Sequence, residues 1–321
     1  MTSTRNAAAL PGGQAEGPTQ IPLRGWQQVV KRALKDSKAN NLPILAGGVA
    51  FFVFLALFPA LIAALTLYGL IADPVLIAQQ IDRLAGALPP TTRELISSQL
   101  TALPESSSGA LTVGLIVSLL AALWGASLGT NGLIVAINAA YHEDETRGFV
   151  RLRATALALT FGAVVFVLVA LALIAGVPVV LDYVGLGGLG RVLAQILRWV
   201  GLVVMFLVGL AVLYRVAGDR ANPRLRWVTP GAVVAAFLWI VGSSAFSLYV
   251  SFFGDYNEIY GPLTGGIMLM LWLYLTSFIV LLGAKINAEA EQHTARDTTT
   301  GSPRPMGWRS AAAADTQAQP E

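Results

Sequence analysis

The sequence predicts an all-α membrane protein, a bundle of six transmembrane helices. Its six long apolar segments lie at residues 43–71, 111–137, 154–181, 198–216, 229–253 and 263–284. Each is close to or above the ~20 residues that a helix needs to cross the hydrocarbon core of a bilayer. Charged residues make up only 12% of the chain, which is about half their share in an ordinary soluble domain.

The length and pattern of these segments favour helices over barrel strands. In lipid, every backbone N–H and C=O group must be hydrogen-bonded within the protein, which leaves helices or a closed barrel. Barrel strands are about half as long and alternate apolar with polar residues. None of the six segments alternates in this way, so a helical bundle follows.

Ahead of the first span, the sequence predicts a tail and an amphipathic helix. Residues 1–20 and 294–321 have the composition of disordered tails, which leaves residues 21–293 as the membrane domain. Apolar residues at helical spacing occupy one side of the next stretch, opposite a row of cations. They are Trp26, Val29, Val30, Ala33 and Leu34, opposite Lys31, Arg32, Lys35 and Lys38. We expect an interfacial helix on an anionic membrane surface, which either anchors the topology or binds a partner.

Residues 72–110 form the one sizeable external connection, and the sequence predicts two short amphipathic helices within it. Pro89-Pro90 breaks the first apolar repeat, and Thr91 with Glu94 then forms a capping-box pattern. These helices either cap a cavity or only pack on the bundle.

The distribution of Lys and Arg predicts the orientation. If the six segments all span, 17 of the 21 Lys and Arg residues lie on the side of both termini. The other side holds Arg83, Arg93, Arg191 and Arg198. By the positive-inside rule, both termini are expected in the cytoplasm. The basic character of the chain therefore reflects topology, and a nucleic-acid partner is not needed to explain it.

An unusual polar motif lies in the second span. Trp124, Asn131 and Asn138 are seven residues apart and share a helix face, and Ser127 lies between them. Asparagines in hydrocarbon need hydrogen-bond partners, so these residues either hold helices together or line a polar path.

The turn between the fifth and sixth spans is dense in carboxylates and aromatic rings. Tyr249 lies near the end of the fifth span, and the turn itself carries Asp255, Tyr256, Asn257, Glu258 and Tyr260. These side chains either receive a cationic or polar head group at an outer mouth or form an aromatic belt at the membrane interface.

The last span ends with Lys285 and Asn287, which complete the candidate substrate-path residues. Long side chains near a membrane edge commonly extend to water, and this is the ordinary interpretation of both Lys285 and Arg198.

Several enzyme classes have no support in the sequence. The chain has no cysteine and only two histidines, and it lacks a Walker loop, a Gly-x-Ser-x-Gly elbow and a His-Glu-x-x-His motif. His142, in an acidic stretch, and His293, beside the C-terminal tail, are both expected to be solvated. We therefore predict no catalytic residue, no metal site and no cofactor.

Taken together, these motifs resemble the YihY/BrkB family of bacterial inner-membrane proteins. The matching motifs are Leu-Trp-x-Ala-Ser-x-Gly at 123–129, Asn-x-x-Tyr at 138–141, Pro-Gly-Ala to Leu-Trp at 230–239, Phe-Ser-x-Tyr at 246–249, Tyr-Asn-x-x-Tyr-Gly at 256–261 and Gly-Ala-x-x-Asn-Ala at 283–288. Two departures stand out. The family usually carries an acid where this chain has Lys285, and paired tyrosines where it has Phe51 and Phe52.

The resemblance implies a six-helix protein of the bacterial inner membrane, linked in some members to virulence or envelope phenotypes. An older name for the family is ribonuclease, which the residues here do not favour. We expect a transporter or flippase for an envelope lipid or small solute, with membrane lipids as partners and no nucleic acid. The alternative is a non-transporting membrane scaffold for envelope assembly, as a homo-oligomer or with another partner. The sequence leaves the substrate and its energy source open.

Overall fold

The structure is a computed structural model that describes residues 10–71, 108–177, 181, 188–221, 223–252 and 263–319. The predicted external helices between the first two spans, and the carboxylate-rich turn from Asp255 to Tyr260, lie outside these described residues. In the part of the chain that is described, the regular structure is helical, with one isolated bridge between Pro223 and Thr299.

Seven long helices account for most of the described chain. They are α2 (Leu23–Ala39), α3 (Leu42–Ile71), α6 (Ser108–Tyr141), α7 (Phe149–Leu171), α9 (Gly188–Val216), α10 (Leu225–Phe252) and α12 (Leu263–Gln292). Three short elements are the 3-10 turn η1 (Pro18–Gln20), the π-helical turn η2 (Ala172–Gly176) and α13 (Ala312–Asp315). The last six long helices coincide with the six predicted apolar segments.

Among the described residues, five helices are long and apolar enough to cross a membrane, and up to six if the bent pair α2 and α3 is counted as one span. The two helices of that pair meet at 69°. The prediction of an all-helical, multi-pass membrane protein is confirmed at this level.

The chain forms two compact units, one of residues 1–51 with 129–321 and one of residues 52–128. In the smaller unit, a Cβ on Gly125 would lie 3.4 Å from the Cα of Ala56, so Gly125 permits close approach of α6 to α3. The hydroxyl of Ser127 donates to the carbonyl of Trp124 at 2.8 Å, within the same helix turn.

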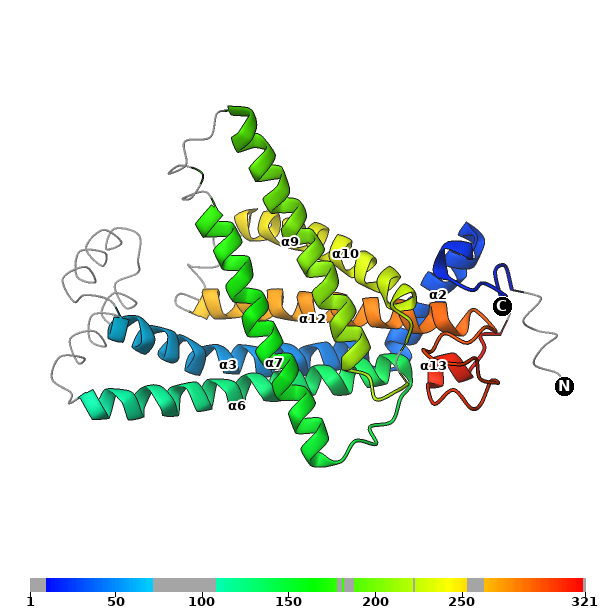
Figure 1. Ribbon diagram of the computed structural model, residues 1–321, viewed down its shortest axis with the longest axis horizontal. Coiled ribbons are helices and arrows are strands. Elements are labelled where there is room, and N and C mark those ends of the chain that lie inside the picture. The colour runs from blue at the N-terminus through cyan, green and yellow to red at the C-terminus, as the bar shows by residue number, and fades with distance from the viewer. Residues whose placement is uncertain are drawn as a thin grey trace. The chain divides into compact units, whose positions relative to one another are not determined.

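In the larger unit, α12 is the central helix and packs against α10, α2 and α13 (Figure 1). Its side chains are buried without interruption from Leu281 to Glu291, whereas the first half of the helix alternates between partly buried and exposed positions. The buried charged residues of α12, Lys285, Glu289 and Glu291, therefore lie at its C-terminal end.

Two glycines let α10 and α12 touch along their backbones. A Cβ on Gly231 would collide with the carbonyl oxygen of Gly283, and the side chain of Asn287 lies against the same point. Asn287 accepts a hydrogen bond from the Gly231 N–H at 2.7 Å and donates to the Val228 carbonyl at 3.1 Å. Because Pro230 interrupts the hydrogen bonding of α10 here, Asn287 satisfies backbone groups that proline would otherwise leave weakly paired.

The apolar side of α2 is divided between two environments. Val29 and Ala33 are fully buried and pack in one core cluster with Ile286 and Ala290 of α12. A second stripe stays exposed and includes Leu23, at 76% exposure. The other members of this stripe are Val30 and Leu34. The predicted amphipathic helix is thus present as a helix, with one face on the protein and an apolar edge beside its cations.

The described parts of both tails make hydrogen bonds to other segments of the chain. The Ala295 N–H donates to the Gly13 carbonyl at 2.9 Å, and the Thr294 hydroxyl donates to the Ala15 carbonyl at 2.7 Å. Arg309 is 5% exposed. It donates to the carbonyls of Ala295, Arg296, Arg304 and Ala314. Composition alone gave no sign of these long-range partners.

Candidate functional site

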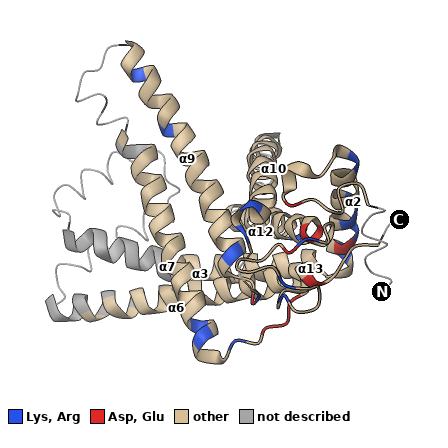
Figure 2. Cartoon of the chain, turned by 45° about the vertical axis from the view of Figure 1, so that its right-hand side comes forward, with Lys and Arg blue, Asp and Glu red and all other residues tan. Residues whose placement is uncertain are grey.

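Charged residues gather around α2, α13 and the C-terminal end of α12 in the larger unit (Figure 2). The spans α10 and α12 are almost free of charge away from this end. Burying a charge is costly unless it is paired and hydrogen-bonded, so each buried ion at this end needs identified partners.

Lys285 lies at the centre of a group that we call the lysine cluster, together with Asp36, His142 and Glu289. Its side chain is fully buried, and the Nζ atom lies 2.7 Å from His142 Nε2. The same atom is 3.0 Å from a carboxylate oxygen of Glu289 and 3.5 Å from one of Asp36. The predicted extension of Lys285 to water is therefore wrong: three partners hold its ammonium group inside the protein.

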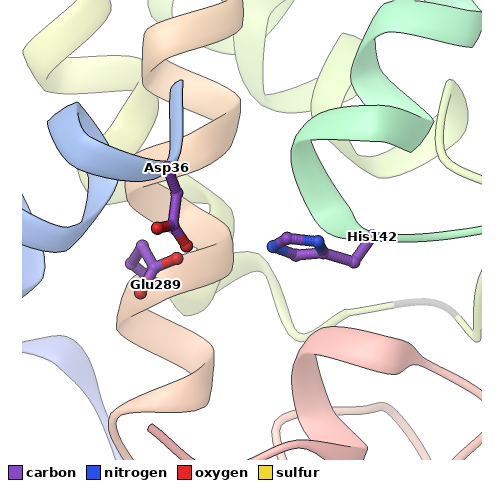
Figure 3. A group of neighbouring side chains, drawn as sticks. All are labelled: Asp36, His142 and Glu289. Atoms are coloured by element: carbon purple, nitrogen blue, oxygen red, sulfur yellow. The ribbon is translucent and has the colours of Figure 1, made fainter. Parts of the chain in front are cut away.

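Three separate elements supply the other members of the lysine cluster. Asp36 comes from α2, His142 follows the last residue of α6, and Glu289 lies on α12, with the side chains directed toward one space (Figure 3). Their ligand atoms all lie within 4.8 Å of one another.

His142 adopts a backbone conformation that favours glycine. Its φ angle is 59°, and it occupies the first position after α6. The Glu143 N–H donates to the Asn138 carbonyl at 2.9 Å, and the His142 N–H to the Ala139 carbonyl at 3.3 Å. This is the Schellman pattern, in which a left-handed residue ends the helix, usually glycine. A histidine here costs about 1 kcal/mol of backbone strain, which the side-chain contacts offset.

The chemistry of lysine fixes the protonation of the His142 ring. An ammonium group can only donate, so Nε2 of His142 accepts and the ring proton is on Nδ1. Partial burial of the ring and the adjacent Lys285 charge both lower the pKa of His142. The imidazole is therefore held neutral in the cluster.

Arg32 and His293 extend the lysine cluster on its far side. Arg32 Nε donates to Glu289 at 3.0 Å, and its Nη2 donates to His293 Nδ1 at 3.1 Å. His293 Nε2 donates to the Pro11 carbonyl at 2.9 Å, and the side chain has no exposed surface. The prediction of a solvated His293 is wrong because the N-terminal segment covers it. Burial is the main cause of its lowered pKa.

A second buried ion pair joins the same end of α12 to the segment after α9. Arg220 Nη1 donates to both carboxylate oxygens of Glu291, at 2.9 and 3.0 Å, and neither side chain is exposed. The guanidinium lies 3.8 Å from the centre of the Tyr141 ring, and the Thr298 hydroxyl donates to Glu291 at 2.8 Å. This pair is locked by groups from four segments of the chain.

An open cleft of about 500 Å³ begins beside His142. It is lined by Asn40, Asn41, Val135, Asn138, Ala139, His142, Glu143, Asp144 and Glu145. Six of these nine residues carry an amide or a carboxylate, so the cleft can bind a polar or cationic group. Asn138 also fixes the cleft wall, because it donates to Glu145 at 2.8 Å and accepts from the Asp219 N–H at 2.8 Å.

The pKa values of two carboxyl groups in the cleft, those of Glu143 and Glu145, are shifted in opposite directions. Burial raises the pKa of Glu143 to about 7, although the Ala312 N–H donates to this carboxylate at 2.7 Å. The hydrogen bonds from Arg147 instead lower the pKa of Glu145. Glu143 therefore changes its charge close to neutral pH.

We expect Glu143→Gln to gain stability relative to the parent as the pH rises from 5 to 8. Between the ordinary pKa of 4.5 and about 7, the folded parent holds a proton on Glu143 that the unfolded chain has lost. The stabilisation from this proton is present below the lower value and is lost as the pH passes the higher one. The difference in Tm between the two proteins in detergent, measured at intervals of half a pH unit, checks this. Asp144→Asn, at an exposed neighbour, serves as the control, and equal slopes for both variants would contradict the assignment.

The structure brings together only some of the predicted path residues. Lys285, Asn287 and Asn138 lie at the charged end of the larger unit, whereas Tyr249 lies near the other end of α10, stacked on Phe246. Asn131 is partly buried on α6. Trp124, at 58% exposure, and the buried Ser127 belong to the smaller unit. The remaining candidates, Asp255, Tyr256, Asn257, Glu258 and Tyr260, lie outside the described residues.

Sequence reasoning missed Asp36, Glu289 and the pair of Arg220 with Glu291. The one usable signal was the spacing of Lys285 and Glu289, because residues four apart on a helix face the same way.

A sequence profile of the family described as virulence factor BrkB matches residues 33–306. The chain belongs to the virulence factor BrkB family. All members of the lysine cluster and the Arg220–Glu291 pair lie within the matched range.

Curated relatives agree with this membership. A ribonuclease-like protein, YfkH of Bacillus subtilis (strain 168), is 38% identical over 247 residues, which cover 75% of this chain and 86% of the relative. A UPF0761 membrane protein of Idiomarina loihiensis is 35% identical over 95 residues, 30% of this chain and 33% of the relative. One of Tolumonas auensis is 40% identical over 87 residues, 26% and 28% of the two chains. No solved structure matches the chain.

The names of these BrkB-family relatives describe membrane proteins and, in one case, a likeness to ribonucleases. Together with the apolar helices, they support a multi-pass membrane protein.

Proposed function

We propose that this BrkB-family protein is a transporter or flippase-like protein of the bacterial inner membrane, with an envelope lipid or small polar solute as its substrate. The observation that carries the proposal is a cleft of about 500 Å³ that shares His142 with the buried Lys285–Glu289 ion pair, at one end of apolar spans. Ionisable groups within spans are costly and commonly mark substrate or ion pathways, and Lys285 and Glu289 lie within the candidate span Leu263–Gln292.

In this proposal, the charged end faces the cytoplasm. The excess of Lys and Arg on the side of both termini supports that orientation. The cleft then opens to the inner leaflet, where its amides and carboxylates can bind an amine or hydroxyl head group. The lysine cluster behind it forms a closed inner gate.

A ribonuclease activity is not part of the proposal. A nuclease usually holds a metal ion near phosphate with carboxylates or histidines. In the described residues, the group with metal-ligand spacing already surrounds the Lys285 ammonium. The cleft is also lined by Glu143, Asp144 and Glu145, which repel a phosphate backbone.

Reconstitution into vesicles tests the proposal. Purified protein is inserted into liposomes that contain fluorescent phosphatidylethanolamine or phosphatidylglycerol, and dithionite is added outside to bleach exposed label. We expect bleaching to extend into the inner leaflet, faster for the amine lipid than for the anionic one. Asp144→Lys, which reverses a charge in the cleft, should slow the bleaching of label from the inner leaflet several-fold. Arg304→Gln, at an exposed position, should leave that rate unchanged.

Native mass spectra from mild detergent provide a second readout for solutes and for unlabelled lipid. A defined lipid or solute retained by the parent and lost in Asp144→Lys supports transport. No inner-leaflet bleaching and no selectively retained molecule would overturn the proposal and leave the membrane scaffold as the better account.

A further inference from the structure

We infer that the Asp36–His142–Glu289 group is a cation-binding site of transition-metal type whose position is taken by the chain's own Lys285 ammonium. The inference does not depend on transport, because it concerns what the lysine cluster holds. Three observations carry it: the donor set, the place of the ammonium, and the strained residue that supplies the imidazole.

The donor set fits a divalent transition metal. One imidazole and two carboxylates come from three different elements, with ligand atoms within 4.8 Å of one another. At Zn²⁺–ligand distances of about 2.0–2.2 Å, the ligand atoms of a tetrahedral site are about 3.3–3.6 Å apart, so the widest pair of the group would have to close by about 1–1.5 Å. Nε2 of His142 already faces the site, 2.7 Å from Lys285 Nζ, so it is placed to coordinate once the lysine is removed.

The ammonium group lies where a metal would bind. Nζ of Lys285 is 2.7 Å from the imidazole nitrogen, 3.0 Å from Glu289 and 3.5 Å from Asp36. The Glu289 oxygen that faces it, Oε1, is buried and makes no hydrogen bond to the described residues. Its contact is the ion pair with the Lys285 ammonium, and a metal ion would replace that ammonium.

The conformation of His142 is the third observation. A glycine would end α6 without strain, yet the chain carries a histidine with a φ of 59° whose ring reaches the cluster. The ring and Asp36 remain accessible, since His142 also lines the cleft and the Asp36 side chain is 37% exposed. A dissolved cation therefore has a route to the site.

The test removes the tethered cation and supplies a free one. We expect Zn²⁺ to raise the Tm of metal-free Lys285→Ala by about 5 °C or more at a concentration roughly 100 times its Kd. The parent protein, in which the ammonium fills the site, should respond much less. The control Lys285→Ala/His142→Gln lacks one ligand and should not be stabilised.

A second variant covers the case in which Lys285→Ala does not fold. Because the chain has no other cysteine, Lys285→Cys adds a single thiolate beside the three ligands. Co²⁺ should then give the visible absorption of a thiolate-bound tetrahedral ion, which Lys285→Cys/His142→Gln should lose. Zn²⁺ responses equal in the parent and in both alanine variants, or a Co²⁺ spectrum unaffected by His142→Gln, would overturn the inference.

Discussion

Arg220→Met is expected to lower the Tm of the protein in detergent by roughly 10 °C. Removing one partner of a buried ion pair leaves the other charge without compensation, which costs about 3–5 kcal/mol, and each kcal/mol moves Tm by a few degrees. Among the described residues, the Glu291 carboxylate would keep the hydrogen bond from the Thr298 hydroxyl, at 2.8 Å, and lose both bonds from Arg220. The contact of the guanidinium with the Tyr141 ring, at 3.8 Å from its centre, would be lost as well.

The double variant Arg220→Met/Glu291→Leu distinguishes two causes of a lower Tm: the cost of leaving the Glu291 charge buried without a partner, and the loss of the attraction within the ion pair. Nε and Nη2 of Arg220 are buried without a hydrogen bond to the described residues, so the native pair is incompletely satisfied. Replacing a buried pair by apolar residues of similar volume is often neutral. We expect the double variant to recover most of the loss in Tm. A double variant as unstable as the single one would show that the pair itself stabilises the fold.

The second large effect is expected for Gly283→Ala. A Cβ here would collide with the hydroxyl of Tyr214 and lie 2.7 Å from the Gly231 carbonyl oxygen. A backbone oxygen cannot turn aside, so α10 and α12 would have to separate. Overpacking typically lowers the free energy of unfolding by about 1–3 kcal/mol. We expect Gly283→Ala to lower it by about 3 kcal/mol or more, because the collision is with the backbone of α10.

Gly265→Ala is the matched control for this prediction. It lies on the same helix, α12, and a Cβ there would meet nothing within 4 Å. Alanine also favours the helix over glycine by ~1 kcal/mol. The two variants are compared by the fraction that remains monodisperse after heating. Equal survival of both would refute the close backbone contact between α10 and α12.

The spans could be predicted from sequence because their signal is local. An uninterrupted apolar run such as 154–181 needs no knowledge of its neighbours to be recognised as a span. The same holds for the helix at Leu23–Ala39, whose apolar repeat was visible. That repeat could not show which of its apolar residues face protein, and only Val29 and Ala33 turned out to be fully buried members of the core.

The site was only partly predictable because its signal is not local. Lys285 was assigned to the membrane edge from its position alone, since nothing in the sequence indicated that Asp36 and His142 would meet it. His142 and Lys285 are 143 residues apart in the chain. His293 and the segments beside it were assigned to solvent for the same reason, although Pro11, 282 residues away, accepts its hydrogen bond.

The wide sequence separation within the lysine cluster also sets an order of events during synthesis. Asp36 leaves the ribosome before His142, and Glu289 follows about 250 residues after Asp36, which corresponds to a delay of roughly 10–50 s at ordinary rates of translation. Until α12 has been inserted, Arg32 and His142 have no partner from that helix. A nascent chain therefore carries the Arg32 charge without its α12 partner, Glu289, through most of its synthesis, and insertion of the last helix is the step that completes the lysine cluster.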